Sequence, residues 1–246
     1  MLSLSNLKKE LRASGTKERA KSAEWFFKTA PGQYGHGDVF LGLTVPKQRE
    51  VAKKYIDLSL DDVEKLLHSK EHEFRLTALL ILVYKYKSKT GNPASLKLRR
   101  TQIYKVYLRN TKWINNWDLV DCTASNIVGE YLASSAKASA GQRKILYKLA
   151  KSKNLWEKRI AIISTLYFIV KENKFKTTLE IAEILLKDEH DLIHKAVGWM
   201  LREIGKRDLK AEEKFLNKHI HKMPKTMLRY AIEKFPEEKR KYYLKK

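Results

Sequence analysis

Two carboxylates and a tryptophan lie close together in the segment Asn115-Asn116-Trp117-Asp118-Leu119-Val120-Asp121. A carboxylate can stabilise positive charge that develops during a reaction, and it does so on the sugar in glycoside hydrolysis. An aromatic face attracts cations, and a carboxylate attracts them more strongly in a partly desolvated cleft. The pair formed by Trp117 and Asp121 therefore predicts a site for a positively charged group.

The chain around this segment is strongly basic. It has 246 residues with 51 Lys and Arg against 28 Asp and Glu, a net charge of +23 and a pI near 9.9. Such a chain attracts polyanions, and nucleic acid is the expected partner of a basic domain. A carboxylate in this surface repels the same partner. The structural alternative is that Asp118 and Asp121 only complement a helix N-terminus, which contributes about 0.3 to 1 kcal/mol each.

The composition predicts a mostly helical protein without cofactor or metal. Ten Gly and five Pro are few for this length, and 43% hydrophobic residues can form a full core. The only cysteine is Cys122, which excludes an intrachain disulfide and a thiolate metal cage and suits a reducing interior. No apolar stretch is long enough for a membrane span or a signal peptide. We expect a cytoplasmic monomer that does not contact membranes.

Apolar residues recur at helical spacing along the chain, and no segment alternates with the period of a strand. Ser59 is placed to cap one helix, and the loop 88–95, with Gly91 and Pro93, ends the next. Helices are predicted over residues 58–67, 74–86, 98–108, 118–134, 140–150, 157–171, 176–186, 192–205 and 211–221.

Self-similarity organises these helices into repeats. Four segments begin a helix with a cation followed closely by Ala or Thr, three of them in the helices above at Arg75, Arg159 and Lys195 and a fourth further on at Arg229. Placing Asp121 in the same register gives steps of 46, 38, 36 and 34 residues, which suit paired-helix repeats of the HEAT or armadillo type. We therefore predict an all-α fold, an α-solenoid of HEAT/armadillo-like helical repeats with a concave basic surface, as a single domain over residues 1–246. In this register one carboxylate interrupts a row of cations.

Two tryptophans accompany this register. Trp117 lies four residues before Asp121 and Trp199 four residues after Lys195, so each shares a helix side with its charged neighbour. Tryptophan at helical spacing is more often part of a core, and this alternative stays open for both residues. A ligand that suits a tryptophan beside a carboxylate is a purine alkylated at a ring nitrogen, because the modified base is cationic and departs through an oxocarbenium-like sugar.

Three stretches of the chain resemble one known family. They are Trp25-Phe26-Phe27-Lys28-Thr29 running on through Pro31-Gly32-Gln33-Tyr34-Gly35 to Gly37-Asp38-Val39-Phe40-Leu41-Gly42, then Asn116-Trp117-Asp118-Leu119-Val120-Asp121, then Gly198-Trp199-Met200-Leu201-Arg202-Glu203. Together they resemble the AlkD-like DNA alkylation repair proteins, which are HEAT-like-repeat alkylpurine DNA glycosylases. The resemblance covers nearly the whole chain.

The resemblance implies roles for individual residues. Asp121 would be the catalytic carboxylate, Trp117 and Trp199 the aromatic walls against the lesion nucleotide, and Arg159 a phosphate-contacting arginine. Family members place a tyrosine in the first helix where this chain has Phe26, so a hydroxyl contact made there would be absent. The candidate DNA-binding residues are Phe26, Arg202, Lys195, Arg75, Lys47 and Arg49.

The implied activity is excision of N3- or N7-alkylated purines from double-stranded DNA in base excision repair. Hydrolysis of the glycosidic bond would leave an abasic site, without a deep base-flipping pocket. Asp121 would stabilise the positive charge on the sugar and orient water. Lyase chemistry is not expected, because no Lys is marked out by its neighbours as an amine with a depressed pKa.

Other patterns carry weaker signals. His68 and His72, like His190 and His194, are spaced i, i+4 and could form half of a metal site, but no Glu or Cys completes either pair. The glycine-rich run 31–38 lacks the GK[ST] ending of a phosphate loop and is expected to connect two helices.

Three functional hypotheses follow. The first is an alkylpurine DNA glycosylase that loses activity in Asp121→Asn. The second is a non-catalytic nucleic-acid binder, for which Asp121→Asn leaves binding unchanged or tighter. The third is a scaffold for an acidic protein, for which Trp117 and Trp199 belong to the core and their replacement by Ala lowers the melting temperature.

Overall fold

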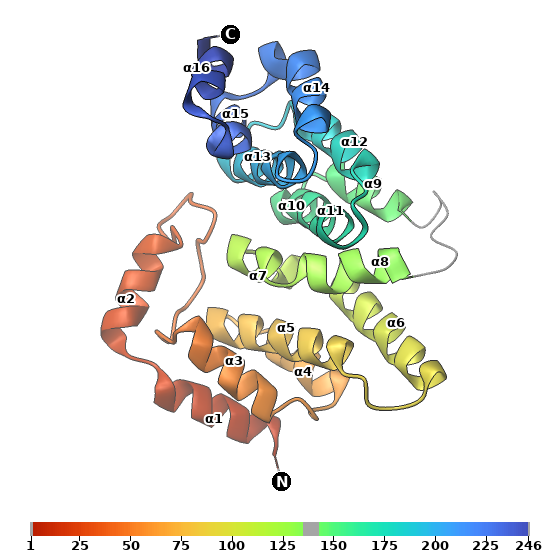
Figure 1. Ribbon diagram of the computed structural model, residues 1–246. Helices are drawn as coiled ribbons and strands as arrows, with labels where there is room; N and C mark the ends of the chain where they lie inside the picture. Colours follow the sequence, from red (N-terminus) through yellow and green to blue (C-terminus); the bar gives the residue numbers. More distant parts are fainter. Residues whose placement is uncertain (1, 135–142, 246) are drawn as a thin grey trace. The chain divides into compact units, whose positions relative to one another are not determined.

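The computed structural model describes residues 2–134 and 143–245, and the elements that it contains there are helices (Figure 1). The described residues include no strand, only an isolated parallel bridge between Val39 and Glu71. The predicted all-α class is thus confirmed. Within these residues no helix has the length and apolar character that crossing a membrane requires.

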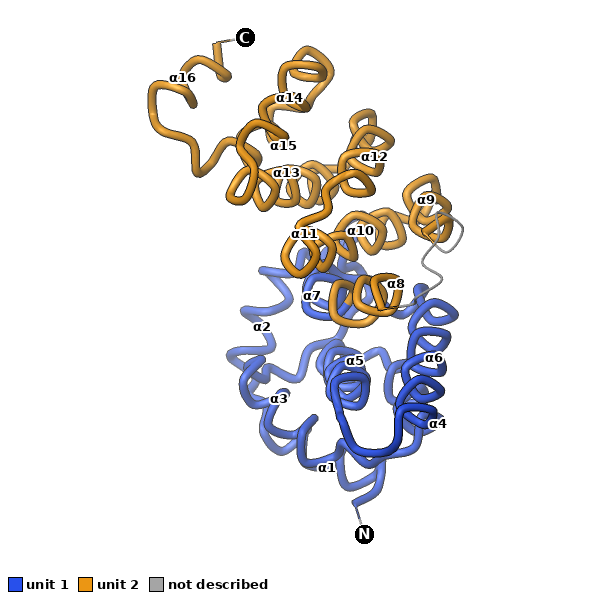
Figure 2. The backbone as a smooth tube through the Cα atoms, turned by 45° about the vertical axis from the view of Figure 1, so that its right-hand side comes forward, with its two compact units in different colours: residues 1–123 blue, residues 124–246 orange. Residues whose placement is uncertain are grey.

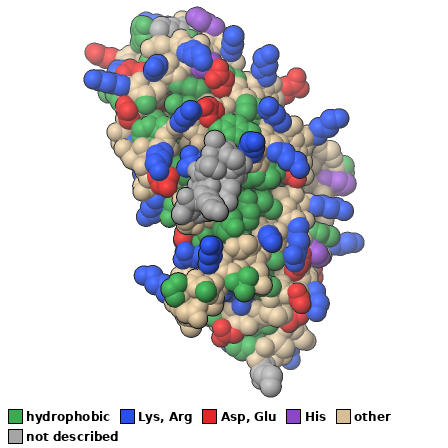
Figure 3. Space-filling view, turned by 90° about the vertical axis from the view of Figure 1, so that its right-hand side faces the viewer, with side chains coloured by type: hydrophobic (Ala, Val, Ile, Leu, Met, Phe, Trp, Pro, Cys, Tyr) green, Lys and Arg blue, Asp and Glu red, His purple; other side chains and the backbone are tan. Residues whose placement is uncertain are grey.

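The chain divides into two compact units, residues 1–123 and 124–246 (Figure 2). The expected single domain over 1–246 stays a prediction. Lys and Arg side chains project along the face shown in Figure 3, with Asp and Glu between them. The concave basic surface and the HEAT or armadillo assignment of the repeats also stay predictions.

Unit 1 is built around one buried helix. Its helices are α1 Leu4–Ser14, α2 Lys17–Phe26, α3 Val45–Lys54, α4 Leu60–Leu67, α5 His72–Lys87, α6 Pro93–Arg109 and α7 Trp117–Asp121. Apolar residues surround α5 on all sides, and from His72 to Val83 every residue is buried. α5 packs against α3, α4, α6 and α7. The start of α5 therefore lies in the unit's interior, next to the short helix α7.

Unit 2 consists of successive helix pairs. Its helices are α8 Glu130–Ser134, α9 Lys144–Ala150, α10 Leu155–Ser164, α11 Leu166–Glu172, α12 Lys176–Leu185, α13 Asp191–Gly205, α14 Leu209–His219, α15 Lys225–Ala231 and α16 Glu237–Lys245. α10 packs on α9 and on α13, and α13 packs in turn on α14 and α15. The helices α10, α13 and α15 therefore form a continuous row in which each buries its apolar side against the next.

The repeat register read from the sequence is reproduced by the helix boundaries. Counting from the first residue of each helix, the fifth position is Asp121 in α7, Arg159 in α10, Lys195 in α13 and Arg229 in α15. Arg75 is the fourth residue of α5. Asp121 therefore occupies in α7 the helix position that a cation occupies in α10, α13 and α15.

Two helices that the sequence predicted as continuous are broken. The segment predicted over 118–134 ends as α7 at Asp121 and resumes through a π-helical turn, Ser125–Gly129, into α8. The segment predicted over 157–171 is divided at Thr165 into α10 and α11. At these breaks the hydroxyl of Thr123 donates to the carbonyl of Leu119, and that of Thr165 donates to the carbonyl of Ile162. Such bonds compete with the backbone ladder of a helix.

The other predicted helices agree with the structure to within a few residues at most ends. The helix predicted over 98–108 starts earlier, because Asn92 caps α6 through a bond to the amide of Ser95 at 2.9 Å. Of the helix predicted over 140–150, residues 140–142 lie outside the described residues, and α9 covers the remainder from Lys144.

The glycine-rich segment between α2 and α3 is fixed to the start of α5. The buried carboxylate of Glu73 accepts hydrogen bonds from the backbone amides of Leu41, Gly42 and Leu43 at 2.7 to 3.2 Å. Gly42 has a φ of +80°, and a Cβ there would lie 2.1 Å from the carbonyl oxygen of Thr16. The segment is therefore an ordered connection, as expected for a link between two helices.

Candidate active site

The helix that carries the Trp-Asp pair begins at a side-chain cap. Asn116 has an extended backbone, and its Oδ1 accepts a hydrogen bond from the amide of Trp117 at 2.8 Å. Leu119 and Val120 are fully buried and hold the five-residue α7 in the core. Trp117 and Asp121 are four residues apart on this helix, and both are partly exposed. The Trp-Asp pair is thus held on a fixed element, and both of its residues are partly exposed.

Trp117 is supported by a series of rings that we call the aromatic column, Phe26, Trp117, Phe27, Phe40 and His72. Phe27 stacks on Trp117 with ring centroids 5.4 Å apart and on Phe40 at 5.1 Å, and Phe40 stacks on His72 at 4.7 Å. Phe26 approaches Trp117 edge-on at 5.8 Å. Such contacts restrict the orientation of each ring, so the indole of Trp117 is preorganised.

Beneath the aromatic column lies a buried group of charged residues that we call the His72 network. The ring of His72 lies between two carboxylates, with Nε2 2.9 Å from Oδ2 of Asp118 and Nδ1 3.2 Å from Oδ2 of Asp38. Arg75 forms an ion pair with Asp38 at 2.7 Å, and the amide of Asn116 donates to Asp38 at 3.3 Å. The network joins α5, α7 and the glycine-rich segment.

Electrostatics within this network favour the charged states of His72 and Asp38. Burial alone would lower the pKa of His72, but the attraction and hydrogen bond of Asp118, with the hydrogen bond of Asp38, raise that pKa to about 9. Burial would raise the pKa of Asp38, yet the hydrogen bond with His72 and the charge of Arg75 hold it below its usual range. His72 is therefore an imidazolium at neutral pH.

The two carboxylates of α7 have different surroundings. Asp118 is buried, and its Oδ1 accepts from the amide of Leu119 at 2.8 Å while its Oδ2 faces His72. Both oxygens of the Asp118 carboxylate are therefore engaged in hydrogen bonds inside unit 1. Asp121, one turn further on, is partly exposed. This difference supports the choice of Asp121 over Asp118 as the candidate catalytic group.

Arg49 and Cys122 lie next to this helix end. Burial raises the pKa of the Cys122 thiol, and the neighbouring charge of Asp118 raises it further, against the effect of Arg49. The side chain of Arg49, from α3, hydrogen-bonds to this thiol. The thiol of Cys122, the residue that follows Asp121, is therefore kept neutral, and Arg49 lies beside this thiol.

Two further candidates for DNA contact lie on the surface of unit 1. Phe26 is 54% exposed at the end of α2, although its edge touches Trp117. Lys47, in the first turn of α3, forms an ion pair with Glu50 at 2.8 Å. Because this pair is exposed to solvent, Lys47 can exchange Glu50 for a phosphate at little energetic cost.

Arg75, which the sequence predicts to bind DNA, has a buried side chain in this structure. Arg75 is 2% exposed, and one of its terminal nitrogens donates to the carbonyls of Ser69 and Lys70 at 2.9 and 3.0 Å. The other pairs with Asp38. Removing a buried guanidinium from such partners is unfavourable. Arg75 therefore stabilises the fold, and a contact with phosphate would require it to leave these partners.

In unit 2, Trp199 is partly exposed on α13, and its indole N–H donates to Glu203. Burial would raise the pKa of Glu203, but hydrogen bonds from Lys206 and Trp199 hold it below its usual range. Gly198 lets α13 approach α15 closely, because a Cβ at this position would lie 2.5 Å from the carbonyl oxygen of Met227. These contacts fix the position of Trp199.

The remaining cations of the predicted site differ in exposure. Lys195 is partly exposed and pairs with Asp191 at 2.6 Å, and Arg202 pairs with Glu233. Arg159 is only 5% exposed, and its guanidinium donates to the carbonyl of Leu192 at the start of α13. It thus holds α10 against α13, and the phosphate contact expected of it stays a prediction.

The histidine pairs do not form half-sites for a metal. His68 follows α4 and bonds to Asn110 at 2.6 Å, whereas His72 belongs to α5 and to the His72 network. His190 caps α13, and His194 bonds to the carbonyl of Asp188. Within the part of the chain that the structure describes, no group of three His, Cys, Asp or Glu is arranged to hold a metal ion.

Sequence reasoning missed the residues that support the Trp-Asp pair. The sequence pattern indicates His72 only as a possible metal ligand. It indicates Asp38, Phe27 and Phe40 only as parts of the motif between Trp25 and Gly42. Their contacts join distant positions, for example Asp38 with Asn116, 78 residues away, and Phe27 with Trp117, 90 residues away. Periodicity within one helix cannot indicate such contacts, although the conjunction of Asn116 and Asp118 around Trp117 was a local sign of capping.

Comparison with known proteins gives a consistent result. The family model described as "DNA alkylation repair enzyme" matches residues 7–235. A solved structure described as "Predicted DNA alkylation repair enzyme from Enterococcus faecalis" is similar with a TM-score of 0.63 and 16% identity, over 91% of this chain and 98% of that chain. At this identity the likeness shows a shared helical-repeat fold. No protein of curated function matches the chain significantly. Because the family model covers nearly its whole length, the chain belongs to the DNA alkylation repair enzyme family.

Proposed function

We propose that the protein is a monofunctional DNA glycosylase for cationic N3- or N7-alkylated purines in double-stranded DNA. The observation that carries this proposal is the Trp-Asp pair. Asp121 is a partly exposed carboxylate one helical turn after Trp117, whose ring is held by the aromatic column, in a chain with a net charge of +23. A negative group on a DNA-attracting surface weakens binding, and a chemical role for Asp121 would offset this cost.

The reaction needs only a carboxylate and water. Alkylation of the ring nitrogen gives the purine a positive charge, so the pair of electrons in the C1′–N bond neutralises the base as it leaves. The sugar becomes oxocarbenium-like, and Asp121 stabilises this charge. Water then adds to C1′ and loses a proton, which leaves an abasic site. Neither a metal nor a cofactor takes part in this scheme.

Trp117 contributes through its indole face. Packed against the deoxyribose, the ring would exclude water from one side and attract the cationic nucleotide. Because Phe27 already stacks on Trp117, the ring loses little further freedom when DNA binds. A labile, charged leaving group needs no enclosed pocket, so a surface site is sufficient for this substrate.

Binding to the phosphate backbone is assigned to exposed and half-exposed cations. Lys47, Lys195 and Arg202 each have an acidic partner that a phosphate can replace, and Arg49 lies beside Cys122. Trp199 is the proposed second aromatic contact to the lesion strand, and Phe26 a further one. The protein would act as a monomer in the cytoplasm, where a single cysteine stays reduced.

The test is release of 7-methylguanine from a methylated DNA duplex. The wild-type protein is expected to release the base and to leave strands that break only after treatment with hot alkali, as abasic sites do. Asp121→Asn is expected to bind the duplex but release base at a greatly reduced rate, whereas the exposed control Asp61→Asn retains activity.

The net charge of +23 also favours a non-catalytic nucleic-acid binder. Both candidates predict steep salt dependence of binding, so binding alone does not separate them. If the wild-type protein releases no base from any alkylated duplex, and Asp121→Asn binds as tightly as the wild type or more tightly, the binder is correct and the glycosylase is not.

A further inference from the structure

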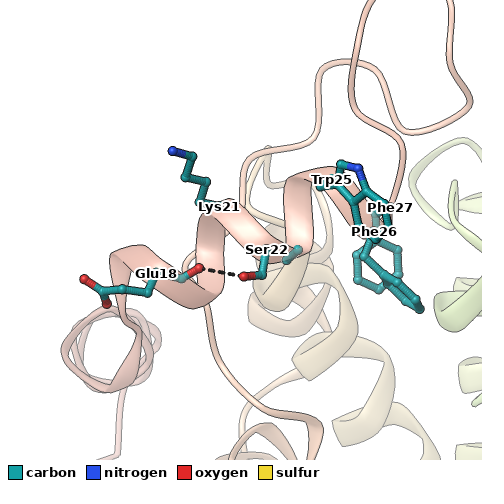
Figure 4. A pocket seen from close by; sticks show the side chains of 7 residues that line it. Glu18, Lys21, Ser22, Trp25, Phe26 and Phe27 are labelled. Carbon is teal, nitrogen blue, oxygen red and sulfur yellow. Dashed lines mark hydrogen bonds between the residues drawn. The ribbon is translucent and has the colours of Figure 1, made fainter.

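Two large aromatic side chains at the end of α2 are exposed to solvent. Trp25 is 75% exposed and Phe26 is 54% exposed, and α2 has no buried residue. They line an open pocket of about 890 Å³ together with Phe27 and Lys21 (Figure 4). Contiguous exposed apolar surface of this kind marks an interaction site more often than it occurs by chance.

The backbone after α2 holds these rings in place. Lys28 has a φ of +58°, an unfavourable conformation for a residue with a side chain, and its amide donates to the carbonyl of Trp25 at 3.3 Å. The amide and the hydroxyl of Thr29 both donate to the carbonyl of Glu24 at 3.2 Å. Gly35 donates to the carbonyl of Lys28 at 3.1 Å. The turn is therefore closed by several bonds, and the rings it carries are preorganised.

A cation accompanies the exposed rings. The strained turn brings Nζ of Lys28 to 4.8 Å from the centroid of the Trp25 ring. Phe26 contacts Trp117 edge-on, so this surface is continuous with the candidate active site. The ammonium lies over one face of the Trp25 ring, whose side chain is otherwise largely exposed. An exposed aromatic ring with a cation matches a nucleotide, whose base presents a π-face and whose phosphate is anionic.

We propose that Trp25 and Phe26 form a stacking platform for an unpaired nucleobase of DNA, with Lys28 contacting the adjoining phosphate. In a paired duplex every base is stacked on its neighbours, so only a base outside the stack can use this surface. The inference rests on the proposed function only in taking DNA as the ligand.

A membrane surface and a second copy of the chain fit this exposed aromatic surface less well than a nucleobase does. A helix that lies in a membrane surface needs an apolar side along its length, whereas the stretch before Trp25 carries Glu18 and Glu24 among its basic residues. A second copy of the chain would repeat the same basic charge across the contact. Both occupants are distinguished by the experiment below.

The experiment uses unmodified DNA, so that base release plays no part. Affinities are measured for a fully paired duplex and for the same duplex with one unpaired thymidine. The wild-type protein should bind the second duplex about tenfold more tightly, as expected for one stacked base. Trp25→Ala should lose this preference and keep the affinity for paired DNA. Lys28→Gln should weaken binding of the unpaired form only.

Tyr242→Ala is the matched control, because this tyrosine is a comparably exposed aromatic residue, 55%, on α16. It should keep the preference for unpaired DNA. The proposal is overturned if the wild type shows no preference, or if Trp25→Ala weakens both duplexes equally.

Two additional measurements test the other occupants. Binding of the wild type, but not of Trp25→Ala, to phosphatidylglycerol vesicles would assign the surface to lipid. A wild-type dimer that Trp25→Ala converts to a monomer in sedimentation would assign it to a second copy. Either result would overturn the proposal. Failure of base release with an intact preference would overturn the glycosylase and leave the stacking platform supported.

Discussion

Nε2 of His72 lies 2.9 Å from Oδ2 of Asp118, and this contact joins the first turn of α5 to the first turn of α7. α7 carries the Trp-Asp pair and is only five residues long, so hydrogen bonds within the helix alone cannot stabilise it. The buried His72 network and the aromatic column provide this stability. Placement of Asp121 therefore depends on residues that do not themselves take part in the proposed chemistry.

The His72 network predicts that stability decreases at alkaline pH. The pKa of His72 is raised from 6.5 to about 9 in the folded protein, so the folded state binds this proton more tightly than the unfolded state. The contribution, on the order of 3 kcal/mol, is complete below about pH 6.5 and is lost as the pH rises through about 9. Urea unfolding measured between about pH 6 and pH 10 tests this expectation.

His72→Gln isolates the contribution of this residue. Because the substitution leaves Asp38 and Asp118 buried without the cation between them, it should lower the free energy of unfolding by about 3 to 5 kcal/mol near neutral pH. The difference from the wild type should become smaller above about pH 9. His36→Gln, at an exposed position, is the control and should follow the wild type at every pH. A constant difference across the pH range would show that His72 is not charged.

Arg75 and Lys47 should affect different properties. Arg75→Gln removes a buried ion pair with Asp38 and should destabilise the fold, leaving the salt dependence of DNA binding unchanged. Lys47→Gln should leave stability nearly unchanged and reduce the slope of log K against log salt by about 0.9, as expected for one lost phosphate contact. Binding titrations at several salt concentrations, with urea unfolding, measure both. A reduced slope in Arg75→Gln would show that this side chain reaches DNA.

The two tryptophans of unit 2 provide a matched comparison. Trp156 is 7% exposed, and Trp156→Ala should lower the free energy of unfolding by about 3 to 5 kcal/mol. Trp199 is partly exposed, so Trp199→Ala should lower it by less than half as much while reducing base release. Thermal unfolding and release assays on both variants test this expectation. Equal loss of stability in the two variants would place Trp199 in the core and favour the scaffold hypothesis.

Asn116 offers a further test of how α7 is positioned. Asn116→Ala removes the cap of this helix and a bond to Asp38, and should destabilise the protein by about 1 to 2 kcal/mol. Asn92→Ala, which removes the cap of α6, is a control of similar chemistry. Both should lower stability, but only Asn116→Ala should slow base release under conditions where each variant is fully folded. Unchanged base release in Asn116→Ala would show that this cap does not contribute to the position of the active-site residues.

Local sequence patterns predicted much of the fold. Apolar periodicity located most helices, and the cation-Ala pattern identified equivalent positions in α10, α13 and α15 because each repeat packs the same way on the next. The breaks after Asp121 and at Thr165 were not predicted. Threonine hydroxyls bond to backbone carbonyls at both breaks, but Thr101 makes the same kind of bond inside the continuous helix α6. A threonine at such a position therefore does not by itself indicate where a helix ends.

The candidate site could be predicted only in part. Trp117 and Asp121 were found because their types and spacing carry chemical information within one helix. Arg75 has a helix position similar to that of Lys195 and Arg229, which are partly or fully exposed, yet it is buried and pairs with Asp38, 37 residues away. Contacts between distant segments decide whether a cation is exposed, and a single sequence does not contain this information.

The role of Asp121 is tested most directly by the single-turnover rate of 7-methylguanine release at saturating protein. The proposed mechanism predicts that Asp121→Asn slows this step roughly 100-fold to 1,000-fold, the range for loss of one group that stabilises transition-state charge. DNA affinity should be unchanged or higher, because a repulsive charge has been removed. An Asp121→Asn variant that releases the base as fast as the wild type would contradict the mechanism.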